Sequence, residues 1–322
     1  MAALLEVENL RVDIPTPSGL LHAVRGVDLR LDRGETLSLV GESGCGKSLT
    51  ALALMGLLPA AAQRSAQRLR FGGQDLVALP ERAMSDLRGD RMAMVFQEPM
   101  TSLNPAYTVG NQLEEALLRH RRLPRSKARE RAVLLLDRVG ITAAGSRLSQ
   151  YPHQLSGGLR QRVMIAMALM CGPELIVADE PTTALDVTVQ AQILHLLKEL
   201  QREFAMALIL ITHDLGIVAR VADRVAVMYA GEVVESAPVK ALFQAPRHPY
   251  TRGLMRCIPV PGRTQPGEKL GVIAGLVPTP IGELTGCQFR NRCEYARPDC
   301  ARPGPEFRRI DAGHEVRCVL AA

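Results

Sequence analysis

The chain has 322 residues, of which 47% are hydrophobic and 22% are charged, with a formal net charge of +6. This length and composition predict about two globular domains with packed cores. The longest apolar stretch, residues 51–62, contains Gly56 and Pro59 and is shorter than the roughly 20 residues that span a bilayer, which excludes a membrane-crossing helix there.

The amino terminus and the net charge bear on location and partners. The first ten residues include Glu6 and Glu8, and they lack the basic region and apolar run of a signal peptide. We therefore expect a chain that stays in the cytoplasm. The positive charge permits nucleic acid or an anionic membrane surface as a partner.

The first chemical motif lies between a predicted strand at residues 35–40 and a predicted helix at 48–58. Here GESGCGKS matches the phosphate-binding pattern of a glycine, four residues and Gly-Lys-Ser. Backbone N–H groups can converge on phosphate oxygens, Lys47 adds positive charge, and the Ser48 hydroxyl can bind Mg²⁺. The ATP-binding residues that the motif predicts are Gly41, Glu42, Ser43, Gly44, Cys45, Gly46, Lys47 and Ser48.

Residues 97–156 are helical in pattern and rich in arginine, which indicates an inserted helical subdomain. Within them, residues 119–131 hold seven basic side chains against one acid, Glu130. Nucleic acid could bind such a run, but aromatic residues, which stack on bases, make up only 3% of the chain. We therefore favour a solvated helix face, which could lie near anionic lipid, and expect no nucleic-acid partner.

The segment LSGGLRQR, residues 155–162, leads into a predicted helix at 159–170. Ser156 is a good helix cap, and Gly157 and Gly158 leave backbone N–H groups exposed at the positive end of that helix, where an anion can bind. Taken alone, the same residues could simply cap a helix.

A buried strand is predicted at residues 175–178, and it ends in Asp179 and Glu180. Neighbouring side chains at a strand end diverge, so Asp179 can hold Mg²⁺ through water while Glu180 orients or deprotonates the attacking water. A solvated strand end is the alternative. A helix at 187–203 and a third strand at 207–212 complete an α/β order, which is typical of a mostly parallel sheet.

In this order the motifs resemble the ATP-binding cassette (ABC) family over about residues 4–240. Gln97 in FQEP resembles the family's Q-loop, residues 184–186 with Asp186 its D-loop, and His213 in ITHD its switch histidine. The resemblance implies an α/β fold of the P-loop NTPase, ABC type, with a mixed or parallel sheet and a helical subdomain at about 97–160. It implies a nucleotide-binding domain over 1–240, followed by a small Cys-rich domain over 241–322.

The resemblance also implies a mechanism. Two such domains meet head to tail, and each ATP lies between the phosphate loop of one and the signature motif of the other. Glu180, His213 and Gln97 would be catalytic, and Asp186 would couple the two sites. Mg²⁺ would be held through Ser48, Gln97 and Asp179.

Two further sets of contacts follow from the resemblance. The signature residues that would reach the ATP of the partner are Leu155, Ser156, Gly157, Gly158 and Gln161. Ile14 matches the position where the family usually stacks an aromatic ring on adenine, so it would cover the purine by dispersion and burial alone.

After about residue 237 the sequence is dense in Pro, Gly and Arg, and it contains Cys287, Cys293, Cys300 and Cys318. Disulfides are disfavoured in a reducing cytoplasm, so the four thiols favour a metal site, which would help to order a segment too short to bury a core. Four thiolates suit Zn²⁺ or an iron–sulfur cluster, although zinc ligands usually lie closer together than these. Unligated thiols are the third alternative.

Three longer segments resemble the dipeptide and oligopeptide importer subfamily: residues 96–105 (FQEPMTSLNP), 151–158 (YPHQLSGG) and 248–259 (HPYTRGLMRCIP). In some importers of this subfamily the equivalent cysteines bind a [4Fe–4S] cluster, which the resemblance implies here. It also implies an ATPase subunit of a bacterial peptide importer, peripheral on the cytoplasmic face of the inner membrane.

The partners implied are a paralogous ABC ATPase as heterodimer partner, two transmembrane permease subunits and an extracytoplasmic peptide-binding protein. An ATPase of a related importer for nickel or other peptide-like solutes is an alternative, and so is a soluble, non-transport ABC ATPase. The transported substrate cannot be predicted from this chain, because recognition in such importers resides in other subunits.

Overall fold

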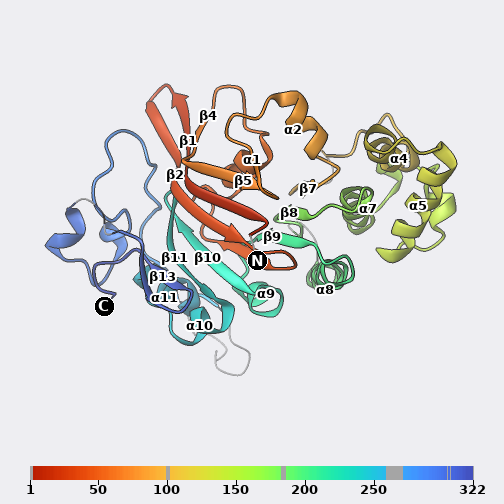
Figure 1. Ribbon diagram of the computed structural model, residues 1–322. Coiled ribbons are helices and arrows are strands. Elements are labelled where there is room, and N and C mark those ends of the chain that lie inside the picture. Colours follow the sequence, from red (N-terminus) through yellow and green to blue (C-terminus); the bar gives the residue numbers. More distant parts are fainter. Residues whose placement is uncertain are drawn as a thin grey trace. The chain divides into compact units, whose positions relative to one another are not determined.

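The computed structural model describes residues 3–98, 102–182, 186–258, 271–302, 304 and 306–321, and Figure 1 shows the chain as a ribbon. The chain forms two compact units. Unit 1 comprises Met1–Leu31, Thr36–Val77 and Thr212–Ala322, and unit 2 comprises Asp32–Glu35 and Ala78–Ile211.

Unit 1 contains an antiparallel sheet near the amino terminus. The long strands β1 (Leu5–Thr16) and β2 (Gly19–Leu31) form a hairpin, and the sheet order is β2-β1-β5-β6 with β4 also paired to β1. The short strands are β4 (Gln63–Ser65), β5 (Arg68–Phe71) and β6 (Gln74–Asp75). This sheet was not predicted, because the alternation of buried and exposed residues in β1 is broken by register shifts between Val7 and Asp13.

Unit 1 also holds the strand that leads into the phosphate loop. β3 (Thr36–Val40) is buried along its length and runs parallel to β10 (Arg224–Tyr229), which confirms the predicted strand. β10 turns back into β11 (Glu232–Pro238), and β13 (His314–Val316) and β12 (Arg308–Asp311) follow beyond it.

The helices of unit 1 are short. They are α1 (Lys47–Met55), α9 (Leu215–Val221), α10 (Val239–Gln244) and α11 (Pro249–Arg256), with the 3₁₀ turns η2 (Arg290–Arg292) and η3 (Pro298–Ala301). α1 ends before the predicted residue 58 because Gly56 takes a left-handed conformation, φ +65°, and caps the helix. Tyr229, Tyr250 and Phe289 belong to one buried cluster, so the carboxy-terminal segment packs on β10 and α11.

The described part of unit 2 contains three parallel strands: β7 (Met92–Val95), β8 (Leu175–Asp179) and β9 (Ala207–Ile211). β8 and β9 are buried throughout, as expected of parallel strands with continuous apolar runs, and both confirm predicted strands. α8 (Val187–Glu203) has the predicted bounds, and α7 (Gly157–Leu169) begins two residues before its predicted start.

The predicted helical segment of unit 2 is confirmed. It contains α4 (Val109–His120), α5 (Arg125–Arg138), α6 (Ala144–Arg147) and the turn η1 (Pro152–Gln154), and α2 (Glu81–Leu87) precedes β7. Figure 1 shows α4 and α5 beside each other and close to α7.

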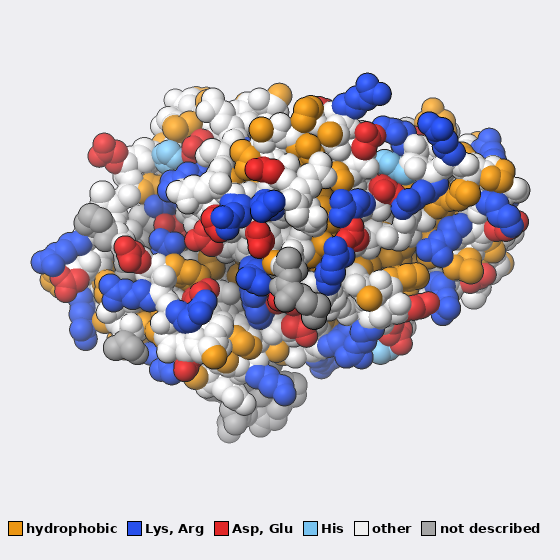
Figure 2. Space-filling model, viewed as in Figure 1, with side chains coloured by type: hydrophobic (Ala, Val, Ile, Leu, Met, Phe, Trp, Pro, Cys, Tyr) orange, Lys and Arg blue, Asp and Glu red, His pale blue; other side chains and the backbone are white. Residues whose placement is uncertain are grey.

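The basic run at 119–131 spans the end of α4 and the first half of α5, where Figure 2 shows Lys and Arg side chains interspersed with hydrophobic ones. Several of its charges have carboxylate partners: Arg119 pairs with Asp86, Arg121 with Asp90, Lys127 with Glu130, and Arg125 and Arg129 with Glu114. Paired guanidinium groups are less available to a phosphate backbone, which agrees with the prediction of a solvated helix face.

Among the described residues, no helix combines the length and the apolar character needed to cross a bilayer.

Candidate nucleotide-binding site

The phosphate loop of unit 1 connects β3 to α1. At two of its positions the neighbouring backbone leaves no room for a side chain. A Cβ at Gly41 would lie 2.3 Å from the Met228 carbonyl oxygen, and one at Gly46 would lie 2.4 Å from the Ala23 carbonyl oxygen. Both have positive φ, +151° and +101°. Only glycine fits both constraints, so the loop can present its backbone N–H groups at the start of α1.

Lys47 is the cation of the loop. Its side chain is 5% exposed, and Nζ donates to the carbonyl oxygens of Gly41 at 2.9 Å and Glu42 at 3.0 Å. The ammonium group is thus fixed at the loop rather than extended into solvent. The Cys45 thiol is fully buried, and burial raises its pKa, so that within the loop this side chain serves as a packing residue.

Glu42 of the loop is held by two residues that sequence reasoning did not find. The Glu42 backbone N–H donates to Tyr250 Oη at 2.9 Å. Arg292 donates to both carboxylate oxygens of Glu42, at 2.7 and 2.9 Å, and its own side chain is 4% exposed. This bidentate pair raises the pKa of Arg292. The carboxy-terminal segment therefore contacts the phosphate loop directly.

The sequence around Tyr250 and Arg292 gave only indirect indications that these residues contact the phosphate loop. Tyr250 lies in the HPY sequence that opens α11, where His248 caps the helix and Pro249 is its first residue. Arg292 lies next to Cys293, in a segment that the sequence associates with metal rather than nucleotide. A contact between residues 250 positions apart cannot be inferred from one sequence.

In unit 2, Gln97 and Glu180 come together. β7 and β8 are parallel neighbours with Val95 opposite Ala178, so the residues after their carboxyl ends meet at one edge. Gln97 Nε2 donates to Glu180 Oε2 at 3.2 Å. Glu180 has a φ of +43°, unusual for a non-glycine residue, and such strain is concentrated at functional sites. Asp179, the last residue of β8, is 6% exposed.

The signature segment, also in unit 2, forms the start of α7. Ser156 is the N-cap, and its Oγ accepts from the Leu159 N–H at 3.4 Å. Gly157 and Gly158 are the first helical residues. Leu155 is 5% exposed, and Gln161 is 2% exposed with an Nε2 that has no hydrogen-bond partner among the described residues.

Two of the other predicted residues lie at helix starts, and one lies on β1. His213 is exposed and precedes Asp214, the N-cap of α9. Asp186 caps α8 by accepting from the N–H groups of Thr188 and Val189. Ile14 is half-buried on β1, and the other D-loop residues, 184 and 185, lie outside the described part of the chain.

The four carboxy-terminal cysteines line one small cavity in unit 1, although they are spread over 32 positions of the chain. Cys300 and Cys318 are buried, and the Cys287 N–H donates to the Cys300 carbonyl oxygen at 2.8 Å. Burial, together with the three neighbouring thiols, raises the pKa of Cys287 to about 11.

The same cavity offers donors that fit a metal centre. His248 also lines it, and its buried Nε2 has no hydrogen-bond partner among the described residues. Sulfur donors that converge from separate segments, with an unsatisfied polar atom beside them, suit a thiolate-bound centre. Within the described residues, however, no three His, Cys, Asp or Glu side chains are already arranged to hold a metal ion.

Comparison with known proteins gives consistent matches. Residues 24–183 match the family described as ABC transporter, and residues 234–300 match the oligopeptide/dipeptide transporter, C-terminal region. The chain is 50% identical to the dipeptide transport ATP-binding protein DppD of Bacillus subtilis, over 99% of this chain and 95% of that protein. It is 48% identical to DppD of Escherichia coli, over 98% and 96% of the two chains.

A solved structure matches the cassette part. It is the dimeric post-hydrolysis state of an ATP-binding cassette bound to ADP and phosphate, with a TM-score of 0.65 and 27% identity, and the match covers 73% of this chain and 98% of that one.

Proposed function

Because the chain belongs to the ABC transporter ATPases that carry the oligopeptide/dipeptide transporter C-terminal region, we propose that it is the ATP-hydrolysing subunit of a bacterial importer for dipeptides or oligopeptides. The observation that carries this proposal is the 50% identity to a dipeptide transport ATP-binding protein over 99% of the chain. Similarity of that extent includes the carboxy-terminal region as well as the cassette.

The proposed chemistry assigns one role to each motif. The loop N–H groups and Lys47 bind the β- and γ-phosphates of ATP. Glu180 orients the attacking water and accepts its proton as the new P–O bond forms and the bond to the ADP oxygen breaks. The hydrogen bond from Gln97 supports this role, because it fixes the Glu180 carboxylate. His213 would contact the γ-phosphate.

Mg²⁺ would be held through Ser48, Gln97 and Asp179, and it would neutralise charge on the phosphates. The burial of Asp179 at the end of β8 supports this proposal, because a buried carboxylate needs a cation or hydrogen bonds to compensate its charge.

We propose that the signature residues Leu155, Ser156, Gly157, Gly158 and Gln161 act on the ATP bound by a partner. The N–H groups of Gly157 and Gly158 support this role, since they lie in the first turn of α7, where backbone N–H groups can donate to an anion. Ile14 would cover the adenine, and Asp186 would couple the two sites.

The functional division proposed is a nucleotide-binding domain over 1–240, with its helical subdomain at about 97–160, and a carboxy-terminal extension over 241–322. As the ATPase of a transporter, the chain has membrane permease subunits as partners. More specifically, we propose a paralogous ATPase as heterodimer partner, two permease subunits and an extracytoplasmic peptide-binding protein. The chain would lie peripherally on the cytoplasmic face of the membrane.

We propose a [4Fe–4S] cluster bound by Cys287, Cys293, Cys300 and Cys318, with Zn²⁺ as the alternative. The shared cavity supports it, since it gathers four sulfur donors. The cluster would supply a rigid cross-link among these segments and a redox-active centre. Iron and acid-labile sulfide should be found in anaerobically purified protein. Stoichiometric zinc without iron would refute the cluster.

The catalytic assignment is tested with Glu180→Gln in the reconstituted transporter. Because the amide cannot accept the proton, steady-state ATP hydrolysis should fall by about 100-fold while ATP stays bound. Glu199→Gln is the matched control: Glu199 is an exposed residue of α8, so this variant should hydrolyse ATP at the wild-type rate. Unchanged hydrolysis in Glu180→Gln would reject the assignment.

The substrate is tested by uptake in cells that lack this gene, with labelled dipeptides, longer peptides and nickel as competing arms. Loss of dipeptide or oligopeptide uptake, restored by the wild-type gene, is the expected result. Loss of nickel uptake alone would place the chain in a nickel importer instead.

A further inference from the structure

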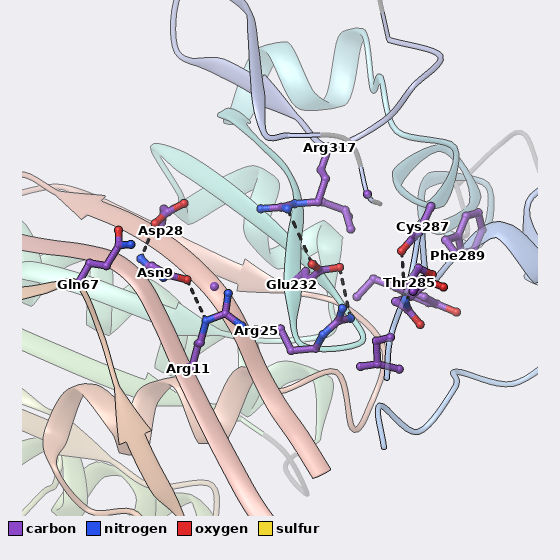
Figure 3. A pocket seen from close by; sticks show the side chains of 17 residues that line it. Asn9, Arg11, Arg25, Asp28, Gln67, Glu232, Thr285, Cys287, Phe289 and Arg317 are labelled. Atoms are coloured by element: carbon purple, nitrogen blue, oxygen red, sulfur yellow. Dashed lines mark hydrogen bonds and ion pairs between the residues drawn. The ribbon is translucent and has the colours of Figure 1, made fainter. Parts of the chain in front are cut away.

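A second cavity of about 530 Å³ lies within unit 1, and residues 41–48 of the phosphate loop are not among those that line it (Figure 3). Its walls come from β1, β2, the start of β11 and the segments around Thr285 and Arg317. This volume is in the range of sites that bind small metabolites. None of its lining residues takes part in the proposed ATP chemistry.

The charged side chains of this cavity are not balanced. Among the described residues, three arginines line it, Arg11, Arg25 and Arg317, against the carboxylates of Glu232 and Asp28. Glu232 lies between two of the cations, 3.4 Å from Arg25 and 3.8 Å from Arg317. The single negative charge of Glu232 therefore has to compensate the positive charges of two half-buried guanidinium groups.

The Arg11 guanidinium and the Asp28 carboxylate do not pair with each other, because each bonds to Asn9. Arg11 Nε donates to the neutral amide oxygen of Asn9 at 3.1 Å, and Asp28 accepts from the Asn9 backbone N–H at 2.6 Å. Burial lowers the pKa of Arg25, the Glu232 carboxylate offsets part of this effect, and the nearby charges of Arg317 and Arg11 lower the pKa further. The buried Nε of Arg317 has no hydrogen-bond partner in the described part of the chain.

The backbone holds these groups in place. The Arg25 N–H donates to the Gly231 carbonyl oxygen and the Arg317 N–H to that of Val234, each at 2.8 Å. Gly26, with a φ of +68°, leaves space for the Asn9 amide that accepts from Arg11: a Cβ there would lie 3.0 Å from Asn9 Oδ1. Arg11 and Arg25 lie on paired strands and Arg317 directly follows β13, so these donors are preorganised for a ligand.

We propose that this cavity binds a small anionic metabolite that presents phosphate or carboxylate oxygens to Arg11, Arg25 and Arg317. Guanidinium forks match both groups bidentately, and an added anion would supply the negative charge that Glu232 alone does not. Gln67, Gln288 and Thr285, which also line the cavity, offer polar contacts for the rest of such a ligand. Cys287 lines this cavity and the cysteine cavity alike, so the site adjoins the proposed cluster.

The test measures binding of orthophosphate and of citrate to the full chain by calorimetry, at constant ionic strength. Mg²⁺ and a non-hydrolysable ATP analogue are kept saturating, so that the phosphate loop is occupied and cannot account for the signal. At least one probe should bind saturably with one site per chain. Binding of orthophosphate alone identifies phosphorylated ligands, and binding of citrate alone identifies carboxylates.

Arg11→Gln should weaken that binding by about tenfold, because it removes one charged donor. Arg11 is exposed on β1, so the variant should fold. Arg70→Gln is the matched control, since Arg70 is an exposed residue of β5 outside the cavity and its change should leave binding as in the wild type. The proposal is overturned if neither probe binds saturably, or if Arg70→Gln weakens binding as much as Arg11→Gln. Either result leaves the proposed ATPase function unaffected.

Discussion

Arg292 links the cysteine-containing segment to the nucleotide site. Its guanidinium group donates hydrogen bonds to both carboxylate oxygens of Glu42. It also donates to the carbonyl oxygens of Ile273 and Ala274. Tyr250 adds a hydrogen bond to the Glu42 N–H. The conformation of the loop that would cradle phosphate therefore depends on residues about 200 and 250 positions further along the chain.

Arg292→Met should weaken ATP binding, because Glu42 would lose a charge-assisted bidentate partner and the loop its anchor. We expect about a tenfold rise in the Kd of a fluorescent ATP analogue, the size typical of losing a hydrogen bond to a charged group. The turnover rate at saturating ATP should change less, because Glu180 and Gln97 are untouched.

The control for that experiment is Arg256→Met. Arg256 also pairs with a glutamate, Glu294, but both side chains are more than half exposed, and such surface pairs contribute little. Its Kd for ATP should equal that of the wild type. An Arg292→Met protein that is folded and binds ATP with wild-type affinity would show that the anchor has no role in nucleotide binding.

Among the site residues, sequence predicted those that belong to local motifs. The phosphate loop, the strand-end acids and the capped signature helix are each specified within about eight residues, so their geometry follows from local glycines and caps. Arg292, Tyr250 and the Arg11–Arg25–Arg317 group come from segments distant in sequence. Their juxtaposition is a product of tertiary packing, which one sequence does not reveal.

At the scale of elements, the beginning of α8 combines a structural and a proposed functional role. Asp186 Oδ1 accepts from two backbone N–H groups, at 3.1 and 2.9 Å, and so caps the helix. The same residue is the proposed D-loop aspartate. A loss of activity in a variant could therefore arise from either role, and substitution has to separate them.

Asp186→Asn keeps a good N-cap, whereas Asp186→Ala loses it. We expect the free energy of unfolding, measured with urea, to stay near the wild-type value in Asp186→Asn and to fall by about 1 kcal/mol in Asp186→Ala. If Asp186 couples the two ATP sites through its charge, hydrolysis by the assembled transporter should fall in both variants. Wild-type hydrolysis in Asp186→Asn would leave Asp186 as a helix cap alone.

Helices and strands with a strong local sequence pattern were predicted, and those with a weak or interrupted pattern were not. β8, β9 and α8 follow the sequence closely, because continuous apolar runs and a 3.6-residue period are strong local signals. The β1–β2 hairpin was missed. Pro15, Pro17 and the bulges between Val7 and Asp13 interrupt its alternation, and its strands are stabilised by pairing across the hairpin.

At the scale of the whole molecule, the carboxy-terminal region is part of unit 1 rather than a loosely attached tail. Phe289 packs edge-on against Tyr229, β13 pairs with β11, and the buried His314 bonds to Glu235 at 2.7 Å. A change in the metal bound at the cysteine cavity would therefore alter contacts with the rest of unit 1. Through Arg292 it would also alter contacts with the phosphate loop.

Removal of one proposed ligand tests this connection. Cys293→Ser should lower the iron content per chain, reduce the melting temperature and weaken ATP binding, because Cys293 follows Arg292 directly. Cys171→Ser is the matched control, since Cys171 lies in unit 2 and outside the cysteine cavity. Equal iron content and equal melting temperature in the two variants would contradict a structural metal centre at these cysteines.

We propose that ATP is bound by the phosphate loop of this chain and enclosed by the signature segment of a partner ATPase, while this chain's own signature does the same for the partner. An experimental structure of the assembled transporter, carrying Glu180→Gln and saturated with Mg²⁺ and ATP, measures this directly. The N–H groups of Gly157 and Gly158 should lie within hydrogen-bonding distance of the γ-phosphate held by the partner. A nucleotide-bound assembly in which those groups face solvent would contradict it.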